Sequence, residues 1–326
     1  MAYPELVLQV GVYDTMNDPQ IKIGIDVSKA SLELSSFDKG KDSVANTPAG
    51  IRSLLRRIQK LPQLPVLCCE ATGGYEKLVV NLCHEVEVPI AVVNARQVRD
   101  FAKSKGILAK TDLIDANVLS MFAEQNTLRL KTKTEPWRQS LQALLTRRED
   151  LKDLITQERN RLETLQDPFV RKQIEANLRM FKKQNQHILK TIEALVSSTE
   201  TLQKLCSRMM QVKGIGLLVA TSLIAFLPEI GQISDKQVAA LAGLAPYNQD
   251  SGTWKGQRHV SGGRSKVRTA LYMPAICAAH NNPVLKEFYD GMILRGKPAK
   301  VALTAVMRKM VCLANRIASD PEFIPS

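Results

Sequence analysis

The chain has 326 residues and is strongly basic, with 45 Lys and Arg against 32 Asp and Glu, a formal charge of +13 and a pI near 9.5. This length predicts two domains or three, and the charge favours a polyanionic partner, with nucleic acid as the first candidate. No apolar run reaches the roughly 18 residues of a membrane span and no signal-peptide pattern opens the chain, so we expect a soluble, intracellular protein without a membrane partner.

The six cysteines predict neither disulfide bonds nor a zinc site. None of them forms a C-x-x-C pair, and most lie within apolar stretches. We expect reduced core residues at all of these positions. They are Cys68, Cys69, Cys83, Cys206, Cys277 and Cys312.

The first part of the chain alternates predicted strands with predicted helices. Residues 1–20 show no clear period and are interpreted as a leader. From there the pattern predicts an antiparallel hairpin, a buried strand and a further strand, with helices between and after them. The expected elements are strands 21–26, 31–37, 65–70 and 89–94, and helices 49–61, 75–86, 96–105 and 111–125. This order indicates an α/β domain over residues 21–130 with a mostly parallel sheet.

The middle of the chain, residues 135–205, is long, charged and helical. Two apolar seams are separated by a Pro turn at Asp167-Pro168, and polar residues interrupt them at Arg148, Glu158 and Asn185. Two such helices fold back as an antiparallel hairpin or pair with those of another subunit. A structural spacer and an arm for dimerisation or RNA contact are equally open interpretations.

Residues 206–326 are predicted to be mainly α, with apolar helices at 238–244, 271–279 and 300–318 around a polar stretch. At its start, the turn formed by Lys213, Gly214 and Gly216 is similar to a helix-hairpin-helix element, which presents backbone N–H groups to a nucleic-acid phosphate. A plain tight helix cap is the alternative.

Four acidic residues stand at the ends of predicted strands or at the start of a predicted helix. Asp26 and Glu70 each end a strand, and Asp112 and Asp115 lie on one face of a helix that Thr111 can cap. In open sheets of this kind, sites form beyond the carboxyl ends of the strands. Each acid alone could have an ordinary structural role, as a cap, as an ion-pair partner or as part of a solvated helix face. Together they form an oxygen-only set that suits Mg²⁺ or Mn²⁺ and in-line displacement at a phosphodiester.

The stretch from Asp250 to Arg268 interleaves glycines with basic residues, and residues 251–326 hold 12 Lys and Arg against 4 Asp and Glu. Glycines let the backbone approach a phosphate, whose charge the basic side chains neutralise. We expect such contacts from Lys255, Arg258, Arg264, Lys266 and Arg268. The plain alternative is a nucleic-acid-binding loop in which Ser251 and Ser261 are spacers. In the more specific alternative, one of the two serines is a nucleophile that attacks phosphorus. The metal would activate it, because no histidine partner is evident beyond His259.

Five motifs occur in one order along the chain: residues 23–29, 70–73, 110–116, 212–216 and the stretch from Ser251 to Ala275. In these motifs the chain resembles the DEDD transposases of insertion-sequence 110-type elements, over about residues 21–318. The leader before Ile21 departs from the family pattern.

The resemblance implies a RuvC-like domain of the RNase H fold over 21–130, a coiled-coil hairpin over 135–205 and a C-terminal transposase domain over 206–326. It implies that Asp26, Glu70, Asp112 and Asp115 form a catalytic, Mg²⁺-binding tetrad and that Ser251 is the nucleophile. Members of this family join donor and target DNA under the guidance of a structured bridge RNA. They act as homo-oligomers in which domains of different subunits can meet, so we expect a dimer or tetramer in the bacterial cytoplasm, associated with the nucleoid when it binds DNA.

Two other functions remain open at this point. A hydrolytic RuvC-like nuclease would use water in place of Ser251 as the nucleophile. A non-enzymatic nucleic-acid scaffold would bind in a salt-sensitive way and cleave nothing.

Overall fold

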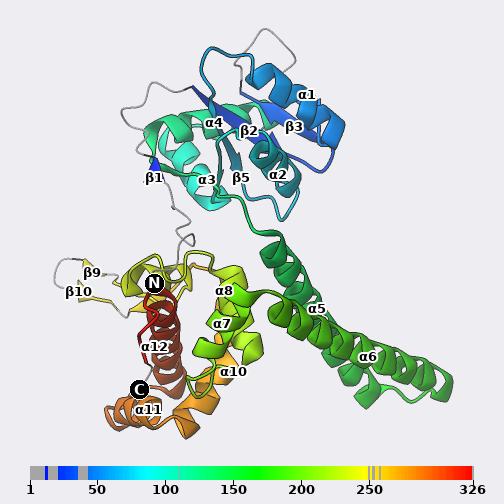
Figure 1. Ribbon diagram of the computed structural model, residues 1–326, viewed down its shortest axis with the longest axis vertical. Helices are drawn as coiled ribbons and strands as arrows, with labels where there is room; N and C mark the ends of the chain where they lie inside the picture. Colours follow the sequence, from blue (N-terminus) through cyan, green and yellow to red (C-terminus); the bar gives the residue numbers. More distant parts are fainter. Residues whose placement is uncertain are drawn as a thin grey trace. The chain divides into compact units, whose positions relative to one another are not determined.

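A computed structural model describes residues 12–13, 21–35, 43–109, 111–248, 250–251, 254–256 and 258–324. The chain forms two compact units, Met1–Lys133 and Thr134–Ser326 (Figure 1). The first is a mixed α/β unit and the second is mainly helical, as the sequence predicted.

Unit 1 is built on a five-stranded sheet of order β4-β3-β2-β5-β6. β3 pairs antiparallel with β2 and β4, whereas β2, β5 and β6 are parallel to one another. This mixed sheet, with its antiparallel strands first in the chain, is consistent with the RuvC-like domain that the resemblance implied. The strands are β2 (Lys22–Val27), β3 (Ser31–Leu34), β4 (Ser43–Ala45), β5 (Val66–Glu70) and β6 (Ile90–Val93).

Helices cover both faces of this sheet, which explains why β5 is continuously apolar. Alternate residues of a strand point to opposite faces. Ile25 and Cys69 pack into the core with α1 and α2, while Val66 and Cys68 pack into a second core with α3 and α4. The helices are α1 (Pro48–Ile58), α2 (Lys77–Glu85), α3 (Ala95–Ser104) and α4 (Asp112–Gln125).

Three short strands of unit 1 were not predicted. They are β4, β1 (Val12–Tyr13) and β7 (Leu128–Arg129). β1 pairs antiparallel with β7, so part of the predicted leader 1–20 belongs to the unit, and the other leader residues lie outside the described residues. Strands of two or three residues are too short to show an alternating pattern. The predicted end of the second strand, at Phe37, also lies outside the described residues.

In unit 2, α5 (Pro136–Thr164) and α6 (Pro168–Ser198) pack along each other as a hairpin within one chain. The turn between them spans residues 165–167, and the Asp167 carboxylate caps α6 by accepting a hydrogen bond of 2.9 Å from the N–H of Val170. Three polar interruptions of the seam each leave a buried atom without a hydrogen-bond partner among the described residues: Arg148 Nε, Glu158 Oε2 and Asn185 Oδ1.

The remaining helices of unit 2 enclose one core, to which the base of the hairpin contributes Leu141 and Ile192. The predicted helix 271–279 begins earlier, at Ser265. Apart from the buried Val267, its first residues are polar or partly exposed, so the apolar pattern did not reveal them. The helix that follows it was not predicted, although Asn282 and Pro283 mark its start. The helices are α7 (Glu200–Met209), α8 (Leu217–Phe226), α9 (Asp235–Leu241), α10 (Ser265–Asn281), α11 (Pro283–Leu294) and α12 (Ala299–Ser319).

All six cysteines are free thiols, and four of them are buried. Burial raises the pKa of Cys68, Cys83 and Cys206 to about 12, so these thiols stay protonated. Cys277 is exposed and Cys312 is half-buried, so the prediction of core cysteines is wrong for Cys277. Among the helices that the structure describes, none is both long and apolar enough to cross a membrane.

Candidate active site

The carboxyl ends of β2 and β5 bring Asp26 and Glu70 to one edge of the sheet in unit 1. These strands are parallel neighbours in a register that pairs Ile25 with Cys69, so the acids that follow occupy matching positions. Neighbouring strands lie about 4.8 Å apart, which keeps the two backbones close enough to share one ligand. Both acids are half-buried.

α4 lies across β2 so closely that only glycine fits at position 24. A β carbon on Gly24 would collide with the carbonyl oxygen of Ala116 and would lie 2.6 Å from the backbone nitrogen of Ser120. The Ser120 hydroxyl donates a hydrogen bond of 2.8 Å to the carbonyl oxygen of Lys22. Because Ser120 meets the start of β2 and Ala116 meets its middle, α4 runs antiparallel to β2. Its first turn therefore points to the end of the strand that holds Asp26.

Asp112 and Asp115 form part of that first turn, as predicted. The Thr111 hydroxyl caps the helix by accepting a hydrogen bond of 3.3 Å from the N–H of Ile114. The cap confirms the predicted helix start and fixes both aspartates near the positive end of the helix dipole.

The acids of the two strands face α4. Gly24 and Asp26 lie two residues apart and so share the face of β2 against which α4 packs. Cys68 and Glu70 share the corresponding face of β5, and Cys68 packs into the core with α3 and α4. The backbone thus brings all four predicted acids to one edge and one face of the sheet.

The side chains of these acids are less close than the backbone placement suggests. Within the described residues, no group of three or more His, Cys, Asp or Glu is placed to hold a metal ion. Carboxylates repel one another unless a cation lies between them, which favours such a spread. The donor set itself fits a hard divalent cation, since it offers only carboxylate oxygens. Asp112 is exposed, so the edge is open to solvent.

Glu76, which sequence reasoning did not single out, holds the loop that follows Glu70. Its carboxylate accepts hydrogen bonds from the N–H and hydroxyl of Thr72, at 3.2 and 2.9 Å, and from the N–H of Gly74, at 2.8 Å. Partial burial would raise the pKa of Glu76, but these bonds and one from its own N–H outweigh burial and lower the pKa. Gly73 and Gly74 have φ of +75° and +125°, which only glycine adopts readily. In the sequence, two glycines followed closely by an acidic residue could have indicated this hydrogen-bonded loop.

Asn46 ties this loop to the turn after β2. Its amide donates hydrogen bonds of 2.8 Å to the carbonyl oxygen of Ser28 and 3.3 Å to that of Tyr75. The turn after Asp26 and the loop after Glu70 are therefore fastened to each other, which limits the movement of both acids.

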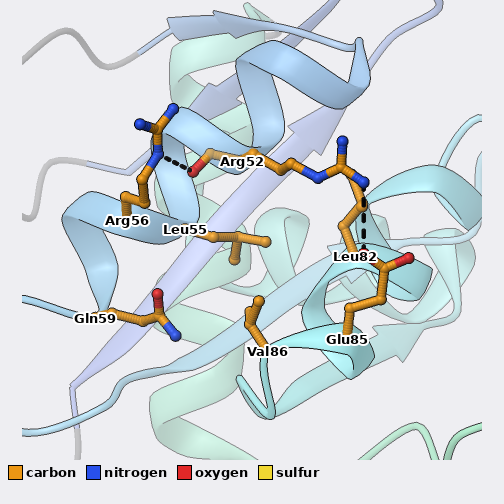
Figure 2. A pocket seen from close by; sticks show the side chains of 7 residues that line it. All are labelled: Arg52, Leu55, Arg56, Gln59, Leu82, Glu85 and Val86. Atoms are coloured by element: carbon orange, nitrogen blue, oxygen red, sulfur yellow. Dashed lines mark hydrogen bonds and ion pairs between the residues drawn. The ribbon is translucent and has the colours of Figure 1, made fainter.

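The cavity of about 220 Å³ between α1 and α2 lies on the other face of the sheet (Figure 2). Arg52 reaches across it to Glu85, with Nη2 at 3.6 Å from the carboxylate, and Arg56 Nε donates to the carbonyl oxygen of Arg52 at 3.3 Å. Since α4 covers the opposite face, this cavity takes no part in the arrangement of the acids.

The basic loop of unit 2 begins with short paired strands. Ser251 lies opposite Trp254 in an antiparallel pair, and a second pair flanks it. These strands are β8 (Pro246–Tyr247), β9 (Asp250–Ser251), β10 (Trp254–Lys255) and β11 (His259–Val260). The backbone places both Ser251 and Lys255 in the pair formed by β9 and β10, and their side chains lie outside the described part of the structure.

Arg264 fastens this loop to the helical core. Its guanidinium donates two hydrogen bonds of 2.6 Å to the Glu229 carboxylate and one of 2.9 Å to the carbonyl oxygen of Phe226. Such a two-pronged pair occupies most of the donors that a phosphate would use. The structure therefore gives Arg264 an anchoring role that the sequence did not indicate.

Arg268 and Lys266 are likewise engaged. Arg268 Nη1 donates to the carbonyl oxygens of Gly262 and Ala242. Lys266 Nζ donates to the Thr146 hydroxyl at 2.6 Å and lies 4.9 Å from the centroid of the Phe226 ring. Arg258, by contrast, is exposed. Of the predicted phosphate contacts with described side chains, Arg258 is the most available.

A turn joins α7 to α8 at the position of the predicted helix-hairpin-helix element. Gly214 has a φ of +106°, and a β carbon there would lie 2.8 Å from Cβ of Ala278, so packing against α10 already explains this glycine. Gly216 has open space around it and begins α8 without a side-chain cap, and Lys213 is exposed. Gly216 and Lys213 keep the access that a phosphate contact requires.

Comparisons with known proteins agree with this arrangement. A sequence model described as a transposase, of the IS110 DEDD type, matches residues 23–169, which include the four acids. A second, described as the transposase IS116/IS110/IS902 family, matches residues 206–290, which include Ser251. The chain belongs to the IS110 family of DEDD transposases.

Relatives of this transposase include two named for DNA rearrangement. The pilin gene-inverting proteins of Moraxella lacunata and Moraxella bovis are each 29% identical over 252 residues, which is 76% of this chain and 78% of theirs. The insertion element IS110 uncharacterized 43.6 kDa protein of Streptomyces coelicolor is 24% identical over 139 residues, 42% of this chain and 34% of its own. Together with the family models, these matches identify the transposase as a DNA transposase/recombinase enzyme.

Proposed function

We propose that this transposase is a metal-dependent recombinase in which Asp26, Glu70, Asp112 and Asp115 hold Mg²⁺ or Mn²⁺ and Ser251 attacks a DNA phosphate. The observation that carries the proposal is the close crossing of α4 over β2 at Gly24, which directs both helix aspartates to the edge holding the strand acids. A bound divalent ion would supply charge stabilisation to the attacking and leaving oxygens of an in-line displacement.

The serine step conserves the energy of the broken strand. Ser251 Oγ loses its proton and forms a bond to phosphorus, while one bond from phosphorus to a sugar oxygen breaks and that oxygen takes up a proton. The sugar hydroxyl of the partner strand then attacks the phosphoserine and releases Ser251. Arg258 orients the phosphates, whereas Arg264, Lys266 and Arg268 hold the loop in place.

The acids belong to unit 1 and Ser251 belongs to unit 2, so the reaction requires that the two units meet in one subunit or between subunits of a homo-oligomer. A dimer or tetramer would allow donor and target DNA to be held at once, and the names of the gene-inverting relatives support recombination between two DNA sites.

We further propose that a structured bridge RNA guides the choice of sites. In this proposal, unit 2 consists of a coiled-coil hairpin and a C-terminal domain that meet near residue 205, and the protein acts on the bacterial nucleoid in the cytoplasm.

The test compares Ser251→Ala with Ser261→Ala, a matched control that removes the other hydroxyl of the same loop. Each full-length protein, purified from its host together with any bound RNA, is incubated with labelled substrate DNA and Mg²⁺ and then denatured on a gel. We expect wild type and Ser261→Ala to form a covalent protein–DNA adduct, and Ser251→Ala to bind DNA without forming one. An adduct with Ser251→Ala would refute the assignment of the nucleophile.

Cleavage without any adduct in the wild type would instead identify a hydrolytic nuclease, and binding without cleavage under any divalent ion would identify a scaffold. The guide is tested separately, by purifying the protein from its host and sequencing the bound nucleic acid. A discrete RNA encoded beside the gene is the expected result, and the absence of any enriched RNA would contradict guidance.

A further inference from the structure

The groove between α11 and α12 is a cavity that the proposed chemistry does not use. Its volume is about 540 Å³, within the range of sites that enclose small ligands. Several apolar side chains line it, among them Val284, Leu285, Phe288 and Leu313. All of the lining residues belong to unit 2, so the cavity is complete within that unit.

The charged side chains that line this groove are mostly basic. Asp235 is the acidic side chain that lines it, and Arg316 neutralises that carboxylate with hydrogen bonds of 2.9 and 2.8 Å. Arg308 and Lys309 also line the groove, and in the part of the chain that the structure describes neither forms an ion pair. Lys309 Nζ lies 3.9 Å from the centroid of the Phe288 ring, so an aromatic face and a cation meet at one point of the wall.

The charge around the groove favours a polyanion. The segment from Asn282 to Ala318 contains 7 Lys and Arg against 2 Asp and Glu. A polyanion that also contacts these apolar side chains and the Phe288 ring needs an apolar group beside its charges, and a nucleotide offers a flat one. The bases of a duplex are stacked inside it, whereas those of a single strand are free to enter a pocket and to stack on an aromatic ring.

We propose that this groove binds single-stranded DNA, with a base against Phe288 and phosphates at Arg308 and Lys309. The Lys309 ammonium is on a flexible side chain, so it can move from the ring to a phosphate as the base takes its place. Strand exchange by a DNA recombinase exposes unpaired DNA, and the established reaction therefore supplies the ligand. The site depends on neither Ser251 nor the four acids, and either proposal can fail without the other.

The experiment uses the full-length protein and a fluorescent oligo-dT of about 12 nucleotides, a length typical of single-strand sites. Arg308→Gln with Lys309→Gln removes two charges from the groove. Lys286→Gln with Lys300→Gln removes two charges from exposed positions of the same two helices outside the groove. We expect the groove pair to weaken binding about tenfold and the control pair about twofold or less. Thermal unfolding checks that both variants are folded.

A second readout locates the bound base. Oligo-dT carrying 5-iodouracil is crosslinked to the wild type by light, and the adduct is mapped by mass spectrometry to the peptide that contains Phe288. Equal loss of affinity in the two charge pairs, equal competition by duplex DNA of the same length, or tighter binding of the matching RNA than of DNA would each overturn the assignment. An adduct confined to peptides outside α11 and α12 would overturn it as well.

Discussion

The acid edge of unit 1, formed by Asp26, Glu70, Asp112 and Asp115, and the basic loop of unit 2, residues 250–268, position charged residues in opposite ways. In the first, the charged groups stand at the ends of two strands and one helix, and a backbone contact at Gly24 sets their placement. In the second, some of the basic side chains hold the loop itself in place. Arg264 donates hydrogen bonds to the Glu229 carboxylate, and Arg268 donates to backbone carbonyl oxygens. The comparison teaches that the sign of a charged side chain does not reveal its role, which depends on where its backbone lies and on the partners that its side chain has.

The largest effect should come from removing one charge at the acid edge. We expect Asp112→Asn to lower the rate of metal-dependent strand exchange by about a thousandfold or more, because a lost ligand removes charge stabilisation in the transition state. Glu124→Gln on the exposed part of the same helix is the control and should act like wild type. A rate for Asp112→Asn that stays within tenfold of wild type would contradict a catalytic role for the acid edge.

The crossing of α4 over β2 can be broken without touching an acid. Gly24→Ala should lower the free energy of unfolding by about 3 kcal/mol, because the new β carbon meets the Ala116 carbonyl oxygen and cannot be relieved by a flexible side chain. Gly291→Ala in α11, where nothing lies within 4 Å of the added carbon, should be neutral or stabilising. Denaturant titration of both variants measures this difference, and equal stabilities would refute the close crossing.

The two roles assigned to arginines of the basic loop can be separated. Arg264→Gln should cost about 2 kcal/mol of stability, since it removes the two charge-assisted hydrogen bonds that Arg264 donates to the partly buried Glu229 carboxylate. Arg258→Gln should leave stability unchanged but weaken DNA binding and reduce its salt dependence, as expected for one lost phosphate contact. The reverse pattern, with Arg258 stabilising the fold and Arg264 acting only on DNA, would overturn the division.

The smallest effect concerns Glu76 and pH. Because hydrogen bonds lower the pKa of Glu76 in the folded protein, its stabilising contribution is fully present above the ordinary value of 4.5 and is lost as pH falls through the folded pKa. Glu76 is only half-buried, and the solvent around it screens its charge, so we expect the contribution to stay below about 1 kcal/mol. The stability difference between wild type and Glu76→Gln should therefore shrink as the pH is lowered below 4.5. A constant difference across pH 3 to 7 would show that the charge of Glu76 is not responsible.

Much of unit 1 could be predicted because its elements are long enough to show a period. The run ending at Glu70 is apolar throughout since helices cover both faces of β5, and Thr111 marks the start of α4 by its capping hydroxyl. The four acids were recognised by their place at the ends of these elements. What the sequence could not supply is the contact of Gly24 with Ala116, which joins residues far apart in the chain.

The sequence was less informative about unit 2. Clustered arginines look alike whether they bind phosphate or a carboxylate of the same protein, and Glu229 lies 35 residues from Arg264. The groove between α11 and α12 was equally hidden, because α11 itself was not predicted and its wall combines side chains from three helices. Such partnerships depend on tertiary packing and leave no local pattern.

The central claim is that the acid edge of unit 1 binds a divalent ion, and Mn²⁺ binding followed by electron paramagnetic resonance tests it most directly. The full-length wild type, Ser251→Ala and Glu124→Gln should each bind Mn²⁺ in competition with Mg²⁺, whereas Asp26→Asn should lose that binding while remaining folded. Undiminished Mn²⁺ binding by Asp26→Asn would contradict the account.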